Sequence, residues 1–177
     1  MPSSDDFLRL NAAVRDVPDF PKPGIIFKDI TPILGNAELF RLSVDAFVEA
    51  TRALKVDKVV GIDARGFVFG AAVAYELGLG FVPVRKKGKL PYVCQSAAYS
   101  LEYGEAVVEM HTDALLAGER VVLIDDLLAT GGTAAAAAKL IEQVGGTLVE
   151  IQFLIELEFL SGRKNLPYDR VRSFLKY

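Results

Sequence analysis

The central segment of the chain reads Val121-Val122-Leu123-Ile124-Asp125-Asp126-Leu127-Leu128-Ala129-Thr130-Gly131-Gly132-Thr133. Its four opening apolar residues, bounded by acids and glycines, predict a strand buried on both faces, as in a central parallel sheet. The alanine-rich residues 134–144 predict a helix. Between them, residues 129–133 predict a tight turn whose glycines leave backbone N–H groups unshielded near the positive end of the helix dipole. Such a turn suits a phosphate group.

The acid pair Asp125 and Asp126 distinguishes this turn from the commonest phosphate loops. A Walker A loop needs a lysine after its glycines, and a dinucleotide-binding loop needs three spaced glycines before any acid. Carboxylates accept hydrogen bonds from vicinal hydroxyls, so acids beside a phosphate cradle predict a phosphorylated sugar such as ribose 5-phosphate. The alternative is that the acids only favour a nearby helix N-terminus and the glycines only turn the chain.

Composition indicates a single domain over residues 1–177. Hydrophobic residues make up 51% of the chain and charged residues 24%, which is typical of a globular protein with one core. The net charge of −3 and the pI of about 5.3 argue against a nucleic-acid partner and favour a small molecule.

Cysteine usage and hydropathy predict a cytoplasmic protein. Cys94 is the only cysteine, so an internal disulfide is excluded and a reducing compartment fits. The first ten residues lack the apolar core of a signal peptide, and no apolar run is long enough to cross a bilayer, so no membrane partner is expected. His111, the only histidine, has no nucleophile elbow to serve and is interpreted as a surface residue at a strand end.

Strand and helix patterns alternate along the rest of the chain. Residues 8–17 show a short helical pattern that ends before Pro18, and Asn36 is placed to cap a helix. Residues 58–63, 81–84, 105–111 and 147–157 read as strands, residues 67–77 as a helix, and residues 161–177 as a loop with a closing strand that carries no visible chemistry. The prediction is an α/β fold with a mostly parallel central sheet flanked by helices.

Cations also follow the predicted strands. Arg65 follows the strand at 58–63, and Arg85, Lys86 and Lys89 follow the strand at 81–84. Ligands of α/β folds bind at the carboxyl ends of parallel strands, so these cations predict an anionic partner beside the acid pair. The alternative is that they are solvated surface residues.

The strand, the acid pair and Ala129-Thr130-Gly131-Gly132-Thr133 resemble the phosphoribosyl pyrophosphate (PRPP) motif of type I phosphoribosyltransferases. The variant Asp-Asp-Leu-Leu-Ala-Thr-Gly-Gly-Thr is similar to the adenine-specific branch of that family. The resemblance spans about residues 20–155. It implies that Asp125, Asp126 and residues 129–133 bind the ribose and 5′-phosphate of PRPP or AMP.

Residues 20–30 resemble the hood that covers the base in this branch, within a hood region expected at residues 1–35. The resemblance implies that Ile26 and Phe27 sandwich adenine, while backbone groups near Ile26 and Lys28 read its edge. An aromatic face against a purine is physically apt. Many relatives carry arginine where this chain has Lys28.

Three further segments carry the same resemblance. Asp63-Ala64-Arg65-Gly66-Phe67 is similar to the family loop that grips pyrophosphate, often through a cis peptide that would here join Asp63 to Ala64. The cations from Arg85 to Lys89 resemble a segment at a homodimer interface that reaches the neighbouring subunit's site. Residues 98–104 resemble part of a mobile lid, expected at 86–104, in which Glu102 approaches the purine and Tyr103 lies among the PRPP and AMP contacts; a hairpin with Glu102 facing water is the alternative.

The resemblance implies a pentosyltransferase of purine salvage that converts adenine and PRPP to AMP and pyrophosphate, with Glu102 and Arg65 as catalytic residues. Mg²⁺ is expected as cofactor, bound mainly through substrate oxygens and water rather than by protein ligands. Two alternatives stay open. One is a PRPP-sensing or purine-sensing regulator with the same fold, and the other is a transferase for another purine base.

Overall fold

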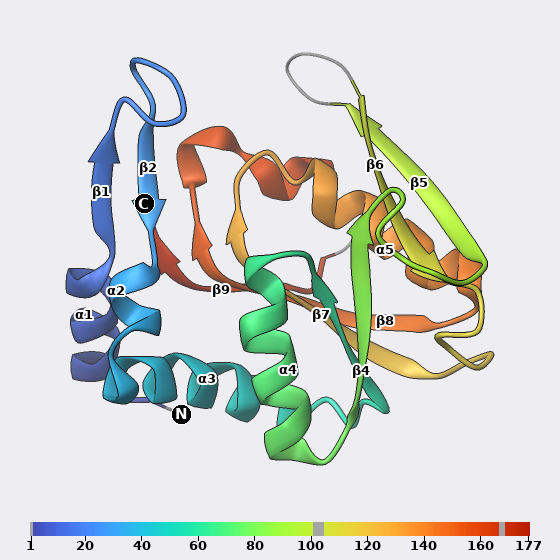
Figure 1. The fold of residues 1–177 in the computed structure, drawn as a ribbon. Coiled ribbons are helices and arrows are strands. Elements are labelled where there is room, and N and C mark those ends of the chain that lie inside the picture. The colour runs from blue at the N-terminus through green and yellow to red at the C-terminus, as the bar shows by residue number, and fades with distance from the viewer. Residues whose placement is uncertain (1, 101–104, 167–168) are drawn as a thin grey trace.

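The computed structural model describes residues 2–100, 105–166 and 169–177 of the chain. Within these ranges a seven-stranded sheet forms the centre of the molecule (Figure 1). Its strands, in sheet order, are β5 (Cys94–Ser100), β6 (Glu105–His111), β4 (Gly80–Lys86), β3 (Lys58–Ile62), β7 (Arg120–Leu128), β8 (Thr147–Glu156) and β9 (Val171–Lys176). From β4 to β9 neighbouring strands are parallel, whereas β6 pairs antiparallel with both β4 and β5. The predicted mostly parallel sheet is confirmed.

The central strand β7 is buried on both faces. Val121 and Leu123 belong to the core beneath α5 (Gly132–Val144), and Val122 and Ile124 belong to the core on the other face. That second core packs α1 (Ser4–Ala13), α3 (Ala37–Arg52) and α4 (Arg65–Leu77) against the sheet. Because successive strand residues point to opposite faces, a run of four apolar residues fills both cores.

Helix starts follow local chemistry where the sequence carries a clear signal. The Asn36 side chain accepts hydrogen bonds from the backbone N–H groups of Glu38 and Leu39, at 3.0 and 3.1 Å, and so caps α3 as predicted. The helix α4 begins at Arg65, two residues before its expected start. This earlier start places Arg65 in the first turn of a helix rather than in a loop.

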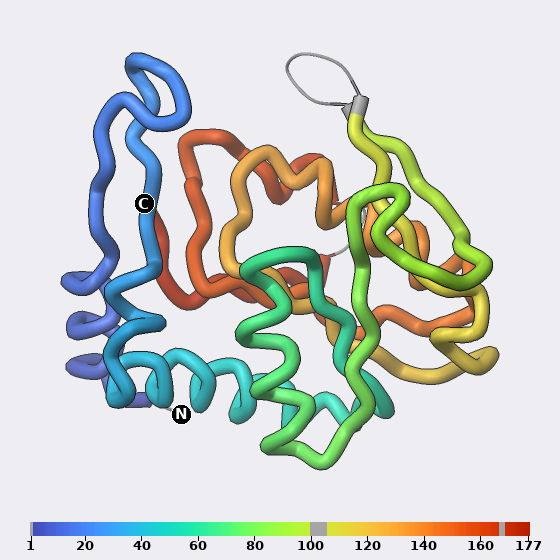
Figure 2. The backbone as a smooth tube through the Cα atoms, viewed as in Figure 1, coloured from blue at the N-terminus to red at the C-terminus, as the bar shows by residue number. Residues whose placement is uncertain are grey.

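The N-terminal hood is a two-stranded antiparallel ribbon of β1 (Arg15–Pro18) and β2 (Ile26–Asp29), followed by the short helix α2 (Thr31–Leu34). The prediction that residues 14–17 continue a helix was wrong, because α1 ends at Ala13 and β1 pairs with β2 from Arg15 onward. Pairing with a strand at residues 26–29 outweighs the weak helical pattern. In Figure 2 the hood stands at one end of the sheet and the β5–β6 ribbon at the other.

The segment expected to be a lid is partly regular strand. Residues 94–100 pair with β6 from Cys94 opposite His111 to Ser100 opposite Glu105. The ribbon's connecting residues 101–104, and with them Glu102 and Tyr103, lie outside the described residues. After β8 the chain forms two 3₁₀ turns, η1 (Glu158–Leu160) and η2 (Gly162–Asn165), which lie between the hood and the β5–β6 ribbon in Figure 1. No helix in the described ranges is long and apolar enough to span a bilayer.

Candidate active site

The turn between β7 and α5 has the geometry that its glycines predict. Gly131 adopts a left-handed backbone conformation, with φ of 84°, immediately before α5 begins at Gly132. Asp125, residues 127–134 and Phe153 line a cavity of about 80 Å³ at this turn. The amides of residues 130–132 donate no backbone hydrogen bond to any residue that the structure describes. The turn therefore combines available donors with a helix N-terminus, an arrangement that suits a phosphate.

The acid pair lies beside this cavity, in the last part of β7. Asp126 is only 4% exposed and Asp125 is partly buried. The Asp126 backbone N–H donates to Asp125 Oδ1 over 2.9 Å. Burial raises the pKa of both carboxyl groups; the neighbouring Asp126 charge raises the pKa of Asp125 further, whereas Arg65 opposes the rise at Asp126. Two acids held in this state favour a ligand that brings hydroxyl donors or positive charge.

Arg65 connects the acid pair with the hood. Its Nε lies 2.7 Å from Asp126 Oδ2, and its guanidinium carbon lies 5.1 Å from the centre of the Phe27 ring. The peptide bond between Asp63 and Ala64, just before Arg65, is cis, as the family resemblance implied. The neighbouring Gly66 packs so closely that an added Cβ would lie 2.7 Å from Asp125 Oδ1. The β3–α4 connection is thus built tightly against the acids.

Arg85 and Lys86 are the last two residues of β4, which extends beyond the predicted strand end at residue 84, and Lys89 lies in the turn that follows. These cations lie at the same edge of the sheet as Arg65, because β3 and β4 are parallel neighbours. Arg85 Nε donates to Asp63 Oδ2 over 2.8 Å, and Arg85 Nη1 donates to the Lys89 carbonyl over 3.1 Å. Lys86 and Lys89 are exposed. Arg85 is therefore held in an ion pair beside the cis peptide, and the two lysines present their charge to solvent.

The hood borders a larger cavity of about 540 Å³. Its lining consists of Gly24, Ile25, Ile26, Lys28, Leu157, Phe159, Leu160 and Tyr177. Phe27 is not part of this lining, because alternate residues of β2 face opposite sides of the ribbon. Ile26 thus lines the hood cavity and the Phe27 ring contacts Arg65. The binding of a base between these two side chains stays a prediction.

Lys28 stabilises the hood through its side chain. Its Nζ lies 2.6 Å from Asp16 Oδ1 on the paired strand and 4.0 Å from the centre of the Tyr177 ring. The Lys28 side chain is only 14% exposed. The hood is thus fastened to the C-terminal residue of the chain by one cation.

Residues 158–165 contact the candidate site from a distant part of the chain. Leu160 lines the hood cavity and also a cavity of about 630 Å³ that reaches Thr130 and Asn165. The Asn165 side chain donates to the Thr130 carbonyl over 2.8 Å. These contacts join residues that are 35 positions apart, and no local pattern in residues 158–165 announces them.

Two further features of the β5–β6 ribbon bear on the predicted lid. Glu109 is 8% exposed, and its carboxylate accepts hydrogen bonds from the Gly88 amide over 2.8 Å and from the Ser96 hydroxyl over 3.2 Å. This acid therefore fixes the cationic turn to the ribbon. Burial, and then the charge of Glu109, raises the pKa of Cys94, so that thiol is kept in its protonated form.

The parallel sheet, the acid pair and the phosphate-shaped turn together define a phosphoribosyltransferase. A family model, described as a phosphoribosyl transferase domain, matches residues 35–173. The match begins just before α3, ends within β9, and includes the acid pair and the turn that follows it.

Similar proteins identify the family within this class. An adenine phosphoribosyltransferase of Acidothermus cellulolyticus is 54% identical over 176 residues, 99% of each chain. The crystal structure of such an enzyme from Rhodothermus marinus is 50% identical, with a TM-score of 0.94 over 99% of this chain and 100% of that one. One from Saccharomyces cerevisiae, complexed with an imino-altritol bisphosphate and adenine, is 44% identical, with a TM-score of 0.92 over 97% and 99%. The chain belongs to the adenine phosphoribosyltransferase family.

Proposed function

We propose that this chain transfers the phosphoribosyl group of PRPP to N9 of adenine, giving AMP and pyrophosphate in purine salvage. The observation that carries this proposal is that three features lie together at one edge of the sheet. They are the buried acid pair, the turn with available amides, and an arginine that contacts both an acid and an aromatic ring of the hood. A phosphorylated sugar whose anomeric carbon faces a purine requires these three neighbours.

Each part of the donor has a candidate partner. The amides and hydroxyls of residues 129–133 bind the 5′-phosphate, and Asp125 and Asp126 bind the ribose hydroxyls. Pyrophosphate is bound by the four cations Arg65, Arg85, Lys86 and Lys89. Arg65 and Arg85 are paired with Asp126 and Asp63 without substrate, so binding pyrophosphate exchanges these partners for phosphate oxygens.

The reaction breaks the bond between ribose C1′ and a pyrophosphate oxygen and forms a bond between C1′ and adenine N9. The electron pair of the broken bond leaves with pyrophosphate, so positive charge develops on the ribose ring. The carboxylates of Asp125 and Asp126 lower the energy of that charge, and the cations stabilise the leaving group. The proton of adenine passes to Glu102, which acts as the base near N7 so that N9 is the nucleophile. Tyr103 contacts the bound nucleotide.

The base lies against Phe27, on the side of β2 that faces Arg65. Backbone groups of Ile26 and Lys28 read its edge, and Ile26 lines the neighbouring hood cavity. A purine stacked on Phe27 stands close to the arginine that holds the acid pair.

The donor set fits Mg²⁺ bound mainly through substrate. In the described ranges no group of three or more His, Cys, Asp or Glu side chains is placed to hold a metal ion. Mg²⁺ often retains several waters and uses one or two carboxylates together with substrate phosphates, and the partly exposed Asp125 beside the cavity can contribute such an oxygen. When bound, the ion neutralises part of the pyrophosphate charge.

The working form is a cytoplasmic homodimer, with Lys86 and Lys89 reaching the site of the neighbouring subunit. The exposed charge of the two lysines supports the shared site, and the presence of a single cysteine fits a reducing compartment. PRPP and adenine are the substrates, and no nucleic-acid or membrane partner is assigned.

The decisive experiment incubates the purified protein with PRPP, Mg²⁺ and each of adenine, hypoxanthine, guanine and xanthine, and follows nucleotide formation by chromatography. AMP formed from adenine, with little product from the other bases, is the expected result. Product from another base would reassign the substrate. Tight PRPP binding without product would identify a sensing protein instead.

A further inference from the structure

The turn that faces the phosphate is held from behind by the C-terminal 3₁₀ turns. Asn165 Nδ2 donates to the Thr130 carbonyl over 2.8 Å. Gly162 lies against the same turn, since a Cβ added to it would be 2.1 Å from the Ala129 carbonyl oxygen. The Gly131 carbonyl accepts from the Ala135 amide over 2.9 Å. Three consecutive carbonyls of the turn therefore point at protein groups.

This arrangement fixes where the amides of the turn point. In a planar trans peptide unit, the carbonyl and the following N–H point in opposite directions. When the carbonyl of Thr130 faces Asn165, the N–H of Gly131 must face away from Asn165. By the same reasoning, the Thr130 N–H points away from Gly162, which the Ala129 carbonyl faces, and the Gly132 N–H points away from the Ala135 amide, which the Gly131 carbonyl accepts from. The described residues accept no backbone hydrogen bond from these three amides.

The 3₁₀ turns are themselves fastened to the sheet. Arg163 forms a two-pronged ion pair with Glu156, in which Nε and Nη2 each lie 2.7 Å from a carboxylate oxygen. Arg163 Nη1 also donates to the Val171 carbonyl over 2.7 Å. Glu156 is 4% exposed, and the Arg163 hydrogen bonds lower its pKa. Asn165 therefore acts from a segment that is anchored on β8 and β9.

We propose that Asn165 is a positioning residue for the sugar donor: its amide holds the Thr130 carbonyl outward, so that the Gly131 N–H faces the 5′-phosphate. The inference rests on the function proposed above. Asn165 lines the larger cavity of about 630 Å³ together with Thr130 and Gly132, but it does not line the small cavity that Asp125 borders. The Thr130 carbonyl can only accept a hydrogen bond, so the side chain must offer a donor. Without the Asn165 amide, the Thr130–Gly131 peptide unit is free to rotate, and the phosphate loses a pre-oriented N–H donor.

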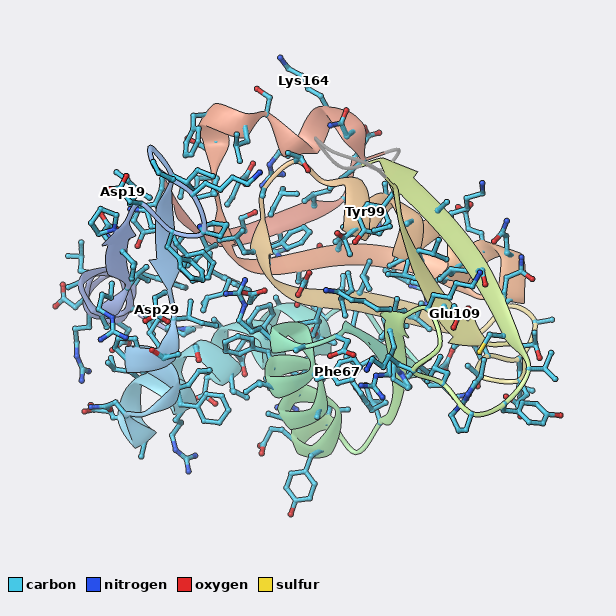
Figure 3. The ribbon with its side chains drawn as sticks, turned by 45° about the horizontal axis from the view of Figure 1, so that its top comes forward. Asp19, Asp29, Phe67, Tyr99, Glu109 and Lys164 are labelled. Atoms are coloured by element: carbon cyan, nitrogen blue, oxygen red, sulfur yellow. The ribbon has the colours of Figure 1, made fainter. Side chains whose placement is uncertain are left out.

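The test compares wild type with Asn165→Ala, Asn165→Asp and the neighbouring control Lys164→Ala. The Lys164 side chain points to solvent, away from the sheet (Figure 3). Binding of ribose 5-phosphate is measured by calorimetry, and KM for PRPP and for adenine by initial rates. Asn165→Ala is expected to weaken ribose 5-phosphate binding about fivefold, which is the effect of about one hydrogen bond. KM for PRPP should rise by a similar factor. Asn165→Asp is expected to weaken both further, because a carboxylate cannot donate and repels the phosphate.

The expected pattern also requires an unchanged KM for adenine and wild-type behaviour of Lys164→Ala. Ribose 5-phosphate affinity equal in Asn165→Ala and wild type would overturn the positioning role. Equal increases in KM for adenine and KM for PRPP would also overturn it, because they indicate a purely structural contact. A folded wild-type protein that fails to bind ribose 5-phosphate would refute the proposed function itself, and this inference with it.

Discussion

Single side chains show that the site is already charged before any substrate arrives. Arg65 divides its guanidinium between Asp126 and the face of Phe27, while Arg85 pairs with Asp63. These pairs keep the cations in place and limit the cost of burying Asp126. The pKa of Asp125 and Asp126 is nevertheless raised, chiefly by burial, so the charged acids are retained at a cost in stability.

Asp125→Asn is therefore expected to stabilise the protein while removing most of its activity. The raised pKa means that the folded state holds the proton more tightly than the unfolded state. The unfolding free energy of wild type then falls as the pH rises from the ordinary carboxyl pKa through the raised one. The variant lacks this loss, so its Tm should exceed that of wild type at neutral pH, by roughly 2–4 °C for each kcal/mol recovered. Its kcat/KM should fall on the order of a hundredfold.

Thermal unfolding between pH 4 and pH 8, with and without the substitution, checks this expectation. The asparagine can still accept the hydrogen bond from the Asp126 amide, so the local geometry is matched. Asp113→Asn, at an exposed loop position, is the control and should leave the Tm profile unchanged. A Tm difference that does not grow with pH would contradict the assigned cause.

Among the secondary-structure elements, those defined by local chemistry could be predicted from the sequence. The strand β7, the helix α5 and the turn between them lie within residues 120–144. They follow from the run of apolar residues, the alanine content and the backbone freedom of the glycines. The cap at Asn36 is equally local. The same residues place the acid pair next to the turn that suits a phosphate. This half of the candidate site could therefore be predicted from the sequence.

The other half depends on contacts between distant segments. Residues 15–18 became a strand because residues 26–29 pair with them, and no periodicity in the segment itself indicated this. The alternation of β2 separates Ile26 from Phe27, which the motif alone did not reveal. Asn165 and Leu160 reach the site from a segment that carries no motif, through the close packing of Gly162 on Ala129.

The hood offers a prediction that separates the two substrates. Lys28 joins β2 to Asp16 on β1 and to the ring of Tyr177, so Lys28→Ala should loosen the hood without touching the phosphate turn. A partly exposed ion pair and a cation–π contact are together worth about 1 kcal/mol. We expect KM for adenine to rise about fivefold, with KM for PRPP changed less than twofold.

Initial-rate measurements with each substrate varied in turn provide this comparison. Lys28→Arg keeps both the charge and the stacking on Tyr177, and it should restore most of the adenine affinity. Equal increases in the two KM values would show that Lys28 supports the whole site rather than the hood.

Across the molecule, the candidate site extends along one edge of the sheet, from the hood to the cationic turn after β4. The hood end has contacts within the chain, since Lys28 meets Asp16 and Tyr177. At the other end, the turn is fixed by Glu109 through the Gly88 amide, yet Lys86 and Lys89 remain exposed. If a second subunit places its acid pair opposite these lysines, the lysines can bind the substrate of that subunit. This is the arrangement expected for a homodimer with shared sites.

Subunit mixing tests the shared site directly. One inactive variant carries Asp125→Asn, and the other carries Lys86→Ala with Lys89→Ala. If the lysines serve the neighbouring subunit, a mixed dimer contains one site with wild-type acids and wild-type lysines. Random exchange makes half of the dimers mixed, so activity should recover to about a quarter of wild type. Each variant refolded alone is the control, and sedimentation of the mixture verifies that dimers formed. Dimers that exchange subunits but recover no activity would place the lysines in the site of their own subunit, because a mixed dimer would then contain two defective sites.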